Sequence, residues 1–503
     1  MSLLVILVTI VISLLLRPSD QVLAYTHYLV DAQNHYPVLA GSELDDCNLC
    51  HLTSSLDWPN LNVYGQAYQN SGYSFVAIQN LDTDGDGYTN LVEINALSAP
   101  GNAADRPILT NPVAWVYLPA LFKAEPVPIN SNYTIIGWND LGMHCMDPDY
   151  ADFSILPPYN TLWAQVIRRG KEPELVTENV TVEYRIINNT YSVVKTDFWD
   201  YAHQLFNLPQ PLLPNVGLTG AGLNGQMHPS NDHFVIEGVP LTEYRDNDLT
   251  TRYPYQIAEL VAKDNKGNIL ATTQTVAPVS TELNCQNCHN DNGSANPTIA
   301  TGVVKQNILT LHDSLESTTL MNERPVLCAN CHSSNALGLP GVAGVPSLSR
   351  AIHNRHSFID TLGSTMEQTC YQCHPGVETK CLRDEPHQDK TCQSCHGGMS
   401  SVANPARTPW VDEPRCETCH DTAHAENSNQ LYRFSTGHGQ VYCQACHGSQ
   451  HAIYPSLEPN DNIQSTRLQG HPGTIDTCTV CHTTMPEENE GPHQGDNNGG
   501  GDD

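Results

Sequence analysis

Hydrophobic and polar positions alternate with the two-residue period of a β strand in the middle of the chain. Between Val180 and Ile186, Val, Tyr and Ile side chains alternate with Thr, Glu and Arg. Two further β-rich runs, Tyr255–Ala262 and Asn268–Val276, flank the turn residues 263–267, which predicts a hairpin. Repeated short strands of this kind predict a β-sandwich-like domain over about 105–280.

A different pattern opens the chain. The apolar run Leu3–Leu16 is followed by Arg17 and Pro18, and a small residue, Ala24, ends the segment. This predicts a secretory signal peptide over 1–24, with an uncleaved membrane anchor as the alternative. Because a bilayer-spanning helix takes about 20 apolar residues, and no later stretch is that long, we expect no integral membrane segment after cleavage. The mature protein is then exported, either to the extracellular space or cell surface or to the periplasm.

A cysteine motif recurs along the chain, once near its beginning and otherwise in its last part, where neither of these two patterns is found. Cys-x-x-Cys-His occurs eight times and uses sixteen of the eighteen cysteines. In chain order the copies, called motif 1 to motif 8 below, are Cys47, Cys50 and His51; Cys285, Cys288 and His289; Cys328, Cys331 and His332; Cys370, Cys373 and His374; Cys392, Cys395 and His396; Cys416, Cys419 and His420; Cys443, Cys446 and His447; and Cys478, Cys481 and His482.

This motif is the attachment signature of a c-type haem. Its two thiols bond covalently to the porphyrin, and its histidine binds the iron from one side. Zinc sites and disulfide frameworks do not require a histidine directly after the second cysteine, so eight such copies speak against both. The sequence predicts eight haem c groups.

The motifs are unevenly distributed and divide the chain. We expect a monohaem module over 25–104, a haem-free β-rich domain over 105–280 and a seven-haem domain over 281–485. Seven motifs leave too little chain for a conventional core around each haem, so we expect short helices and loops wrapped around closely stacked haems. The tail 486–503 is acidic and rich in Gly and Asn, which predicts disorder.

The charge balance excludes one class of partner. With 23 Lys and Arg against 54 Asp and Glu, the net charge is −31. Nucleic-acid binding needs a basic face to neutralise phosphates, so we expect no nucleic-acid partner. Cationic proteins and divalent ions suit this surface better.

A second histidine on each iron would close the iron to substrate and leave it an electron carrier. The chain has 23 histidines, of which eight belong to motifs. Two histidine ligands also favour a low reduction potential. The candidate second ligands are His27 and His35 for motif 1, and for the others His312, His353, His356, His387, His424, His438, His451 and His471. Weaker candidates are His144, His203, His228, His233 and His493. The sequence does not give the pairing.

A calcium loop follows motif 1. Oxygen ligands recur at the spacing of an EF-hand loop, with a backbone carbonyl at its seventh position and a bidentate carboxylate at its twelfth. We expect a structural Ca²⁺ site there, against a solvated acidic turn as the alternative. Its ligands are Asp82, Asp84, Asp86, Tyr88 through its carbonyl, Asn90 and Glu93.

Two cysteines, Cys145 and Cys381, belong to no motif. In an exported protein the simplest expectation is a disulfide between them. The alternative is a ligand role for the cluster Met143-His144-Cys145.

Several segments give the chain a family likeness. Gly137–Cys145, Cys381–Asp384, Cys395–Met399 and Gly448–Pro455, together with motif 1 and the loop Asp82–Glu93, resemble segments of exported multihaem c-type cytochromes of metal-reducing bacteria. The resemblance implies extracellular electron transfer to minerals, redox partner proteins or partner cells. Some members of this class polymerise into haem-lined filaments, so the resemblance also raises a homopolymer.

Three functions follow from these observations. The leading hypothesis is an electron conduit without catalysis. The alternative is a multihaem reductase with one open haem, acting on nitrite, hydroxylamine or a sulfur oxyanion. A third is a haem-bearing structural or adhesive surface protein. In several multihaem reductases the catalytic haem has a lysine in place of the motif histidine, whereas all eight motifs here end in histidine. Histidines that could be second ligands are also plentiful, and both observations favour the conduit.

Overall fold

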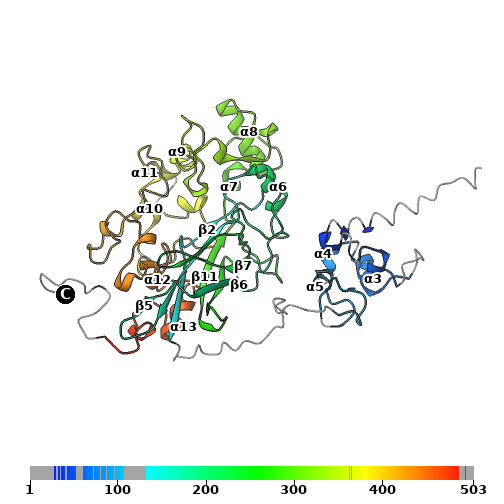
Figure 1. Ribbon diagram of the computed structural model, residues 1–503. Helices are drawn as coiled ribbons and strands as arrows, with labels where there is room; N and C mark the ends of the chain where they lie inside the picture. The colour runs from blue at the N-terminus through cyan, green and yellow to red at the C-terminus, as the bar shows by residue number, and fades with distance from the viewer. Residues whose placement is uncertain are drawn as a thin grey trace, which may run out of the picture. The chain divides into compact units, whose positions relative to one another are not determined.

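The computed structural model describes residues 28–106, 132–486 and 493, apart from gaps at 30–31, 34, 40–41, 43, 53–59, 72, 80, 87, 96, 362 and 364. The expected signal peptide, His27 and all of the tail except Pro486 and His493 lie outside the described residues. The chain forms two compact units, Met1–Lys123 and Ala124–Asp503. The β-rich range and the range of motifs 2–8 therefore belong to one unit (Figure 1).

The N-terminal unit is built from single turns and short helices around an aromatic core. Tyr36, Tyr64 and Phe75 are buried in this core. Asn62 caps the first helix by accepting a hydrogen bond from the Gly65 amide at 2.8 Å, and its own amide donates to Leu49 in motif 1. The cap thereby fixes motif 1 to the helix. The elements are η1 (Pro37–Leu39), η2 (Cys47–Leu49), α3 (Val63–Asn70), α4 (Phe75–Ile78) and α5 (Asn90–Asn95).

The C-terminal unit contains two five-stranded sheets and a small two-stranded one. The first sheet runs β1 (Tyr133–Asn139), β4 (Asn160–Arg168), β9 (Phe234–Val239), β8 (His228–Pro229), with β5 (Glu174–Leu175) beside β4. The second runs β2 (His144–Cys145), β11 (Ile269–Ser280), β10 (Tyr255–Asp264), β6 (Val180–Ile186), β7 (Asn224–Gln226). The third pairs β12 (Val326–Leu327) with β3 (Phe153–Ser154).

The strands expected from the alternating pattern are confirmed. Strand β6 buries its apolar positions and leaves its polar ones more open, and β10 and β11 form the predicted antiparallel hairpin. The two large sheets pack face to face across Gly137 of β1. A Cβ atom at Gly137 would lie 2.2 Å from Leu260 Cδ1 of β10, so a larger residue there would require the Leu260 side chain to move.

Burial differs sharply between the two parts of this unit. Among the described residues, 33 buried hydrophobic side chains lie within 132–280 but only twelve within 281–486. The second range is made mainly of short helices and single turns, which Figure 1 shows above, to the left of and below the sheets. Its α helices are α7 (Gln286–His289), α8 (Val304–Glu316), α9 (Leu348–Arg355), α10 (Cys392–His396), α11 (Met399–Val402), α12 (Cys443–His447) and α13 (Ile463–Gln469); α6 (Phe198–Leu205) belongs to the β-rich range. No helix of the described residues is long and apolar enough to span a bilayer.

The motif-rich range is attached to β1 through a glutamine. The side-chain oxygen of Gln464 in α13 accepts from the Gly137 amide, and its nitrogen donates to the Gly137 carbonyl, both at 2.8 Å. Thr273 of β11 donates to the same oxygen. Trp138 then packs against Tyr442, close to motif 7. The segment 137–145 is thus one of the places where the two parts of the unit join, the pairing of β12 with β3 being another.

A buried ion pair closes the same junction. Arg383 forms a bidentate pair with Asp461, at 2.6 and 2.9 Å, and both side chains are almost fully buried. The same guanidinium donates to the Gly142 carbonyl at 2.8 Å. Gly142 has φ of +74° and a Cβ there would lie 1.9 Å from the Gln450 carbonyl oxygen, so the turn requires glycine.

Breaking this pair should destabilise the C-terminal unit. We expect Asp461→Asn to cost about 3–5 kcal/mol, because it leaves the Arg383 charge buried without a counter-ion. Thermal unfolding of the holoprotein measures the effect. Asp389→Asn removes a carboxylate from an exposed pair with Lys390 and should stay within about 0.5 kcal/mol of the original. Equal losses in the two variants would contradict this role.

Candidate haem and calcium sites

All eight motifs adopt the same local structure, a single helical turn. In motifs 1 to 4, 6 and 8 the histidine amide donates to the carbonyl of the first cysteine at 2.8–3.0 Å. Motifs 5 and 7 lie within α10 and α12. One turn brings both thiols and the imidazole to the same side of the backbone. This is the arrangement that covalent attachment and iron binding together require.

The histidines of motifs 2 to 8 each lie opposite one further histidine. The distances between ring centres all fall between 5.8 and 6.4 Å. The pairs are His289–His356 at 6.1 Å, His332–His312 at 6.4 Å, His374–His353 at 6.0 Å, His396–His451 at 6.0 Å, His420–His387 at 6.1 Å, His447–His493 at 5.8 Å and His482–His438 at 6.0 Å.

This common spacing fits a metal between the rings. An imidazole nitrogen binds a metal at about 2 Å and lies about 1 Å from its ring centre, so two imidazoles on opposite sides of one ion have centres about 6 Å apart. The interplanar angles range from 19° to 85°. Stacking would give one preferred angle, whereas ligands on opposite sides of an iron can each rotate about the bond. The spacing is constant while the angle is not, which favours the metal.

Hydrogen bonds at Nδ1 orient many of these rings. Nδ1 of His353 lies 2.7 Å from the Ser349 carbonyl, and Nδ1 of His356 lies 2.8 Å from the Ile352 carbonyl, both on α9. Nδ1 of His387 lies 2.6 Å from a carboxylate oxygen of Asp384. A donating Nδ1 leaves the Nε2 lone pair for a metal and holds the ring in place. Similar Nδ1 contacts, at 2.8–2.9 Å, occur at His312, His332 and His482.

The site also favours neutral imidazoles. Burial, and then the neighbouring His451 ring, lowers the pKa of His396 to about 4. An iron ligand must be deprotonated at the binding nitrogen, so a low pKa supports binding at neutral pH.

The structure sorts the candidate second ligands. His312, His353, His356, His387, His438 and His451 each face a motif histidine. Two candidates do not: His471 contacts Asp476 and its own neighbours, and His424 contacts Asp421 and His493. His493, a weaker candidate in the sequence, lies opposite His447 instead. No local pattern in the sequence marks His493, because its position opposite His447 is a tertiary contact.

Motif 1 is different from the rest. Among the described residues, no second histidine ring lies opposite His51, and its buried Nδ1 has no hydrogen-bond partner. His35 instead contacts Gln79 at 3.2 Å and stacks on Phe75. The other candidate, His27, lies outside the described residues.

The predicted calcium loop gathers its carboxylates. Asp82, Asp84 and Asp86 offer oxygens within 4.8 Å of one another. Glu93 is fully buried, and neither of its carboxylate oxygens has a hydrogen-bond partner. Burial and the neighbouring aspartates raise the pKa of Glu93 from 4.5 to about 8. Buried acidic oxygens without donors are a set that a divalent cation would satisfy.

Two further predicted calcium ligands, Asn90 and Tyr88, make hydrogen bonds within the fold. Asn90 is buried, donates to the Ile78 carbonyl at 2.7 Å and accepts from Thr83 at 2.7 Å, so its amide is engaged within the fold. The Tyr88 amide donates to Asp86 at 2.9 Å, which places its backbone in the loop.

Cys145 and Cys381 are free thiols that lie near each other. The charge of Cys381 adds to burial in raising the pKa of Cys145. Cys381 Sγ also lies 3.9 Å from Nδ1 of His451, the histidine opposite motif 5. The disulfide stays a prediction. The structure adds that this thiol contacts a candidate iron ligand.

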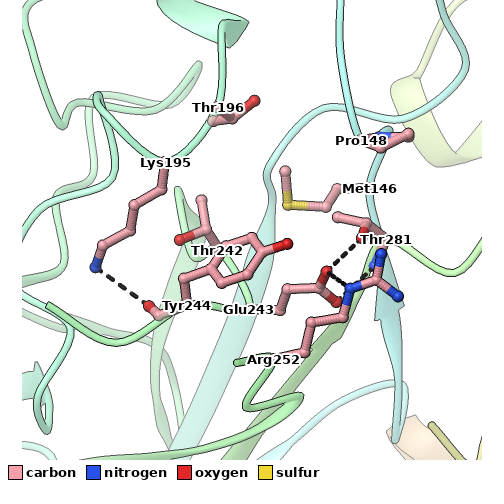
Figure 2. A pocket seen from close by; sticks show the side chains of 9 residues that line it. All are labelled: Met146, Pro148, Lys195, Thr196, Thr242, Glu243, Tyr244, Arg252 and Thr281. Carbon is pink, nitrogen blue, oxygen red and sulfur yellow. Dashed lines mark hydrogen bonds and ion pairs between the residues drawn. The ribbon is translucent and has the colours of Figure 1, made fainter. Parts of the chain in front are cut away.

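The β-rich range holds a small cavity that carries no comparable chemistry. It has a volume of about 110 Å³ and is lined by charged side chains (Figure 2). Glu243 accepts from the Thr281 amide and pairs with Arg252 at 2.9 Å, while Lys195 pairs with Asp246 at 2.7 Å. The charged side chains that line the cavity are therefore paired within the fold.

Removing the tail histidine should open one iron. We expect His493→Ala to produce one additional carbon-monoxide-binding haem per chain, because motif 7 loses its second imidazole. The reduced holoprotein is titrated with carbon monoxide and followed by its Soret band. His471→Ala is the matched control and should change nothing. If His424→Ala opens the site and His493→Ala does not, His493 is not the ligand.

Chelation should make the N-terminal unit sensitive to pH. Because the folded-state pKa of Glu93 lies above its usual 4.5, at about 8, the metal-free fold binds more protons than the unfolded chain between those values. Its unfolding temperature in chelator should therefore fall as pH rises through this interval, and Ca²⁺ should restore it. Glu93→Gln should abolish the pH dependence and weaken Ca²⁺ binding by more than about tenfold. An unfolding temperature that Ca²⁺ leaves unchanged would rule the site out.

Comparison with known proteins adds no assignment. No protein-family model, curated protein or solved structure matches this chain. The candidate sites therefore rest on the repeated motif and on the spacing of the histidine pairs.

Proposed function

We propose that this protein transfers electrons through eight covalently bound haem c groups, outside the cytoplasm. The observation that carries the proposal is the set of seven histidine pairs, each with the spacing of two imidazoles on one metal. Bound haem supplies a one-electron carrier at each motif. The chain's own residues would attach it through thioethers and, at motifs 2–8, supply ligands from both sides.

Closed irons favour transfer over catalysis. An iron with two protein ligands has no position for a substrate, so motifs 2–8 suit electron carriage. Pairs of histidine ligands also favour low potentials. We infer a conduit from a cellular donor to redox partner proteins or minerals, with the net charge of −31 favouring cationic docking surfaces.

Motif 1 supports the alternative function. Because no second histidine faces His51 among the described residues, a haem there is the one to examine for an open position. An open iron in the N-terminal unit would favour a reductase acting on nitrite, hydroxylamine or a sulfur oxyanion. The calcium loop, whose proposed ligands include Asp82, Asp84, Asp86 and Glu93, would brace this unit.

The test is an optical spectrum of the purified holoprotein, reduced and oxidised, with and without carbon monoxide, and with haem measured per chain. We expect eight haems, all low-spin, of which at least seven are unchanged by carbon monoxide. A shift confined to one haem that is lost when Cys47 and Cys50 are both replaced by alanine would move the reductase to first place. Fewer than seven covalent haems would contradict the conduit.

Self-association is a separate proposal from the family resemblance. A filament would place haems of successive copies within electron-transfer reach. Sedimentation of the calcium-loaded protein over a wide concentration range tests it, since a monomer throughout excludes the filament.

A further inference from the structure

We propose that motifs 2–8 form one unbranched row in space, in the order 3–2–4–5–6–7–8. Chain order and spatial order differ at one place, where motif 2 lies between motifs 3 and 4. The inference rests on the proposed function to the extent that bound haems would follow the order of their attachment sites. The order itself is carried by contacts between polypeptide segments.

Helix α8 links motif 3 to motif 2. It carries His312, which faces His332 of motif 3. Asn307, one turn earlier on the same helix, donates to the carbonyl of His289 in motif 2 at 2.9 Å. The first cysteines of the two motifs also share the buried Asp147 and Lys305 as electrostatic neighbours.

Helix α9 links motif 2 to motif 4. His353 lies in the last turn of α9 and His356 directly follows the helix, and they face His374 and His289 respectively. The motifs also touch directly, since the Asn287 amide donates to Gln372 at 3.2 Å. Among the described residues, no hydrogen bond or ring contact joins 328–332 to 370–374. Motif 4 is therefore the neighbour of motif 2 and not of motif 3.

Motif 4 is in direct contact with motif 5. Gln393 of motif 5 donates to Thr369 at 2.7 Å, and the Cys392 thiol donates to the Met366 sulfur at 3.5 Å. Thr369 directly precedes motif 4, so the haem attachment points of the two motifs are adjacent.

The row continues to motif 6 and motif 7. His387, five residues before motif 5, faces His420 of motif 6 at 6.1 Å. The Cys416 amide of motif 6 donates to Glu426 at 2.9 Å. The next residue, Asn427, donates through its amide to the Ser435 hydroxyl, and the Ser435 carbonyl accepts from the Cys443 amide of motif 7 at 2.9 Å.

Motif 8 follows motif 7 and ends the row. The Ile475 amide donates to the carbonyl of Cys446 at 2.9 Å, and Cys446 and Cys481 pack on the same hydrophobic cluster. His438, which faces His482 of motif 8, lies on the turn just before motif 7. Each link in the row therefore has contacts of its own. His451, four residues after motif 7, faces His396 of motif 5, so the row turns at motif 6.

The row makes motifs 3 and 8 the two exchange points of the C-terminal unit. An electron entering at one end would pass every other motif before leaving at the other. Motif 2, although first in the sequence of this unit, is internal. A partner docking beside motif 3 and one docking beside motif 8 would thus be connected in series.

The experiment locates the irons in crystals of the holoprotein by anomalous scattering at the iron absorption edge. We expect the iron of motif 2 between those of motifs 3 and 4, so that the distance from motif 3 to motif 4 is the longest of the three. An iron of motif 3 lying between those of motifs 2 and 4 overturns the order. An iron with three near neighbours would also overturn the proposed order, because the row would then branch.

Two variants identify the peaks without tracing the chain. Replacing both cysteines of motif 3 by alanine should remove a terminal peak, and replacing both cysteines of motif 4 should remove an internal one. If a variant does not fold, the chain trace of the original protein assigns the peaks. If the proposed function is wrong, the optical spectrum differs from the one expected for eight haems. If only the order of the row is wrong, the optical spectrum is as expected and only the iron positions differ.

Discussion

In the proposed haem-bound protein, the C-terminal part would depend on its paired histidines, because few buried hydrophobic side chains hold it. The twelve buried hydrophobic side chains among its described residues are spread over about two hundred positions, far below the density of the adjoining sheets. Each motif is only one helical turn. Two thioethers and two imidazoles converging on one rigid group would replace a conventional core at each of seven places. On this view, the metal-binding geometry and the fold of the region have one cause.

The strands of the β-rich range provide a fixed surface to which the motif-rich range is attached. Gln464 continues the backbone pairing of β1, and Arg383 joins the segment around Gly142 to Asp461. The junction lies next to motif 5, since Cys381 contacts His451, and next to motif 7, since Trp138 packs on Tyr442. A haem-free domain can thereby influence the position of ligands that it does not itself supply.

Local patterns in the sequence predicted local structure well. The β6 strand, the hairpin β10–β11 and the acidic loop after motif 1 each depend on neighbouring residues, and each appears where expected. Which histidine faces which motif depends on tertiary contacts, so eight candidates could be named but not paired. His471 has the same local setting as several true partners, yet it is exposed and bound to Asp476. The role of Gln464 could not be predicted either, because a side-chain amide that pairs with a distant backbone segment produces no periodic pattern in the sequence.

The position of each partner histidine along the chain has a consequence for maturation. For motifs 3, 4, 6 and 8 the opposing histidine precedes the motif, whereas for motifs 2, 5 and 7 it follows. If the chain is exported N-terminus first, haems of the former set can acquire both ligands as soon as they are attached. Those of the latter set must wait with one side uncovered until His356, His451 or His493 has emerged. During export, some haems would then have both iron ligands while others still had an open coordination position. The haem of motif 7 would be the last to gain its second ligand, when His493 emerged.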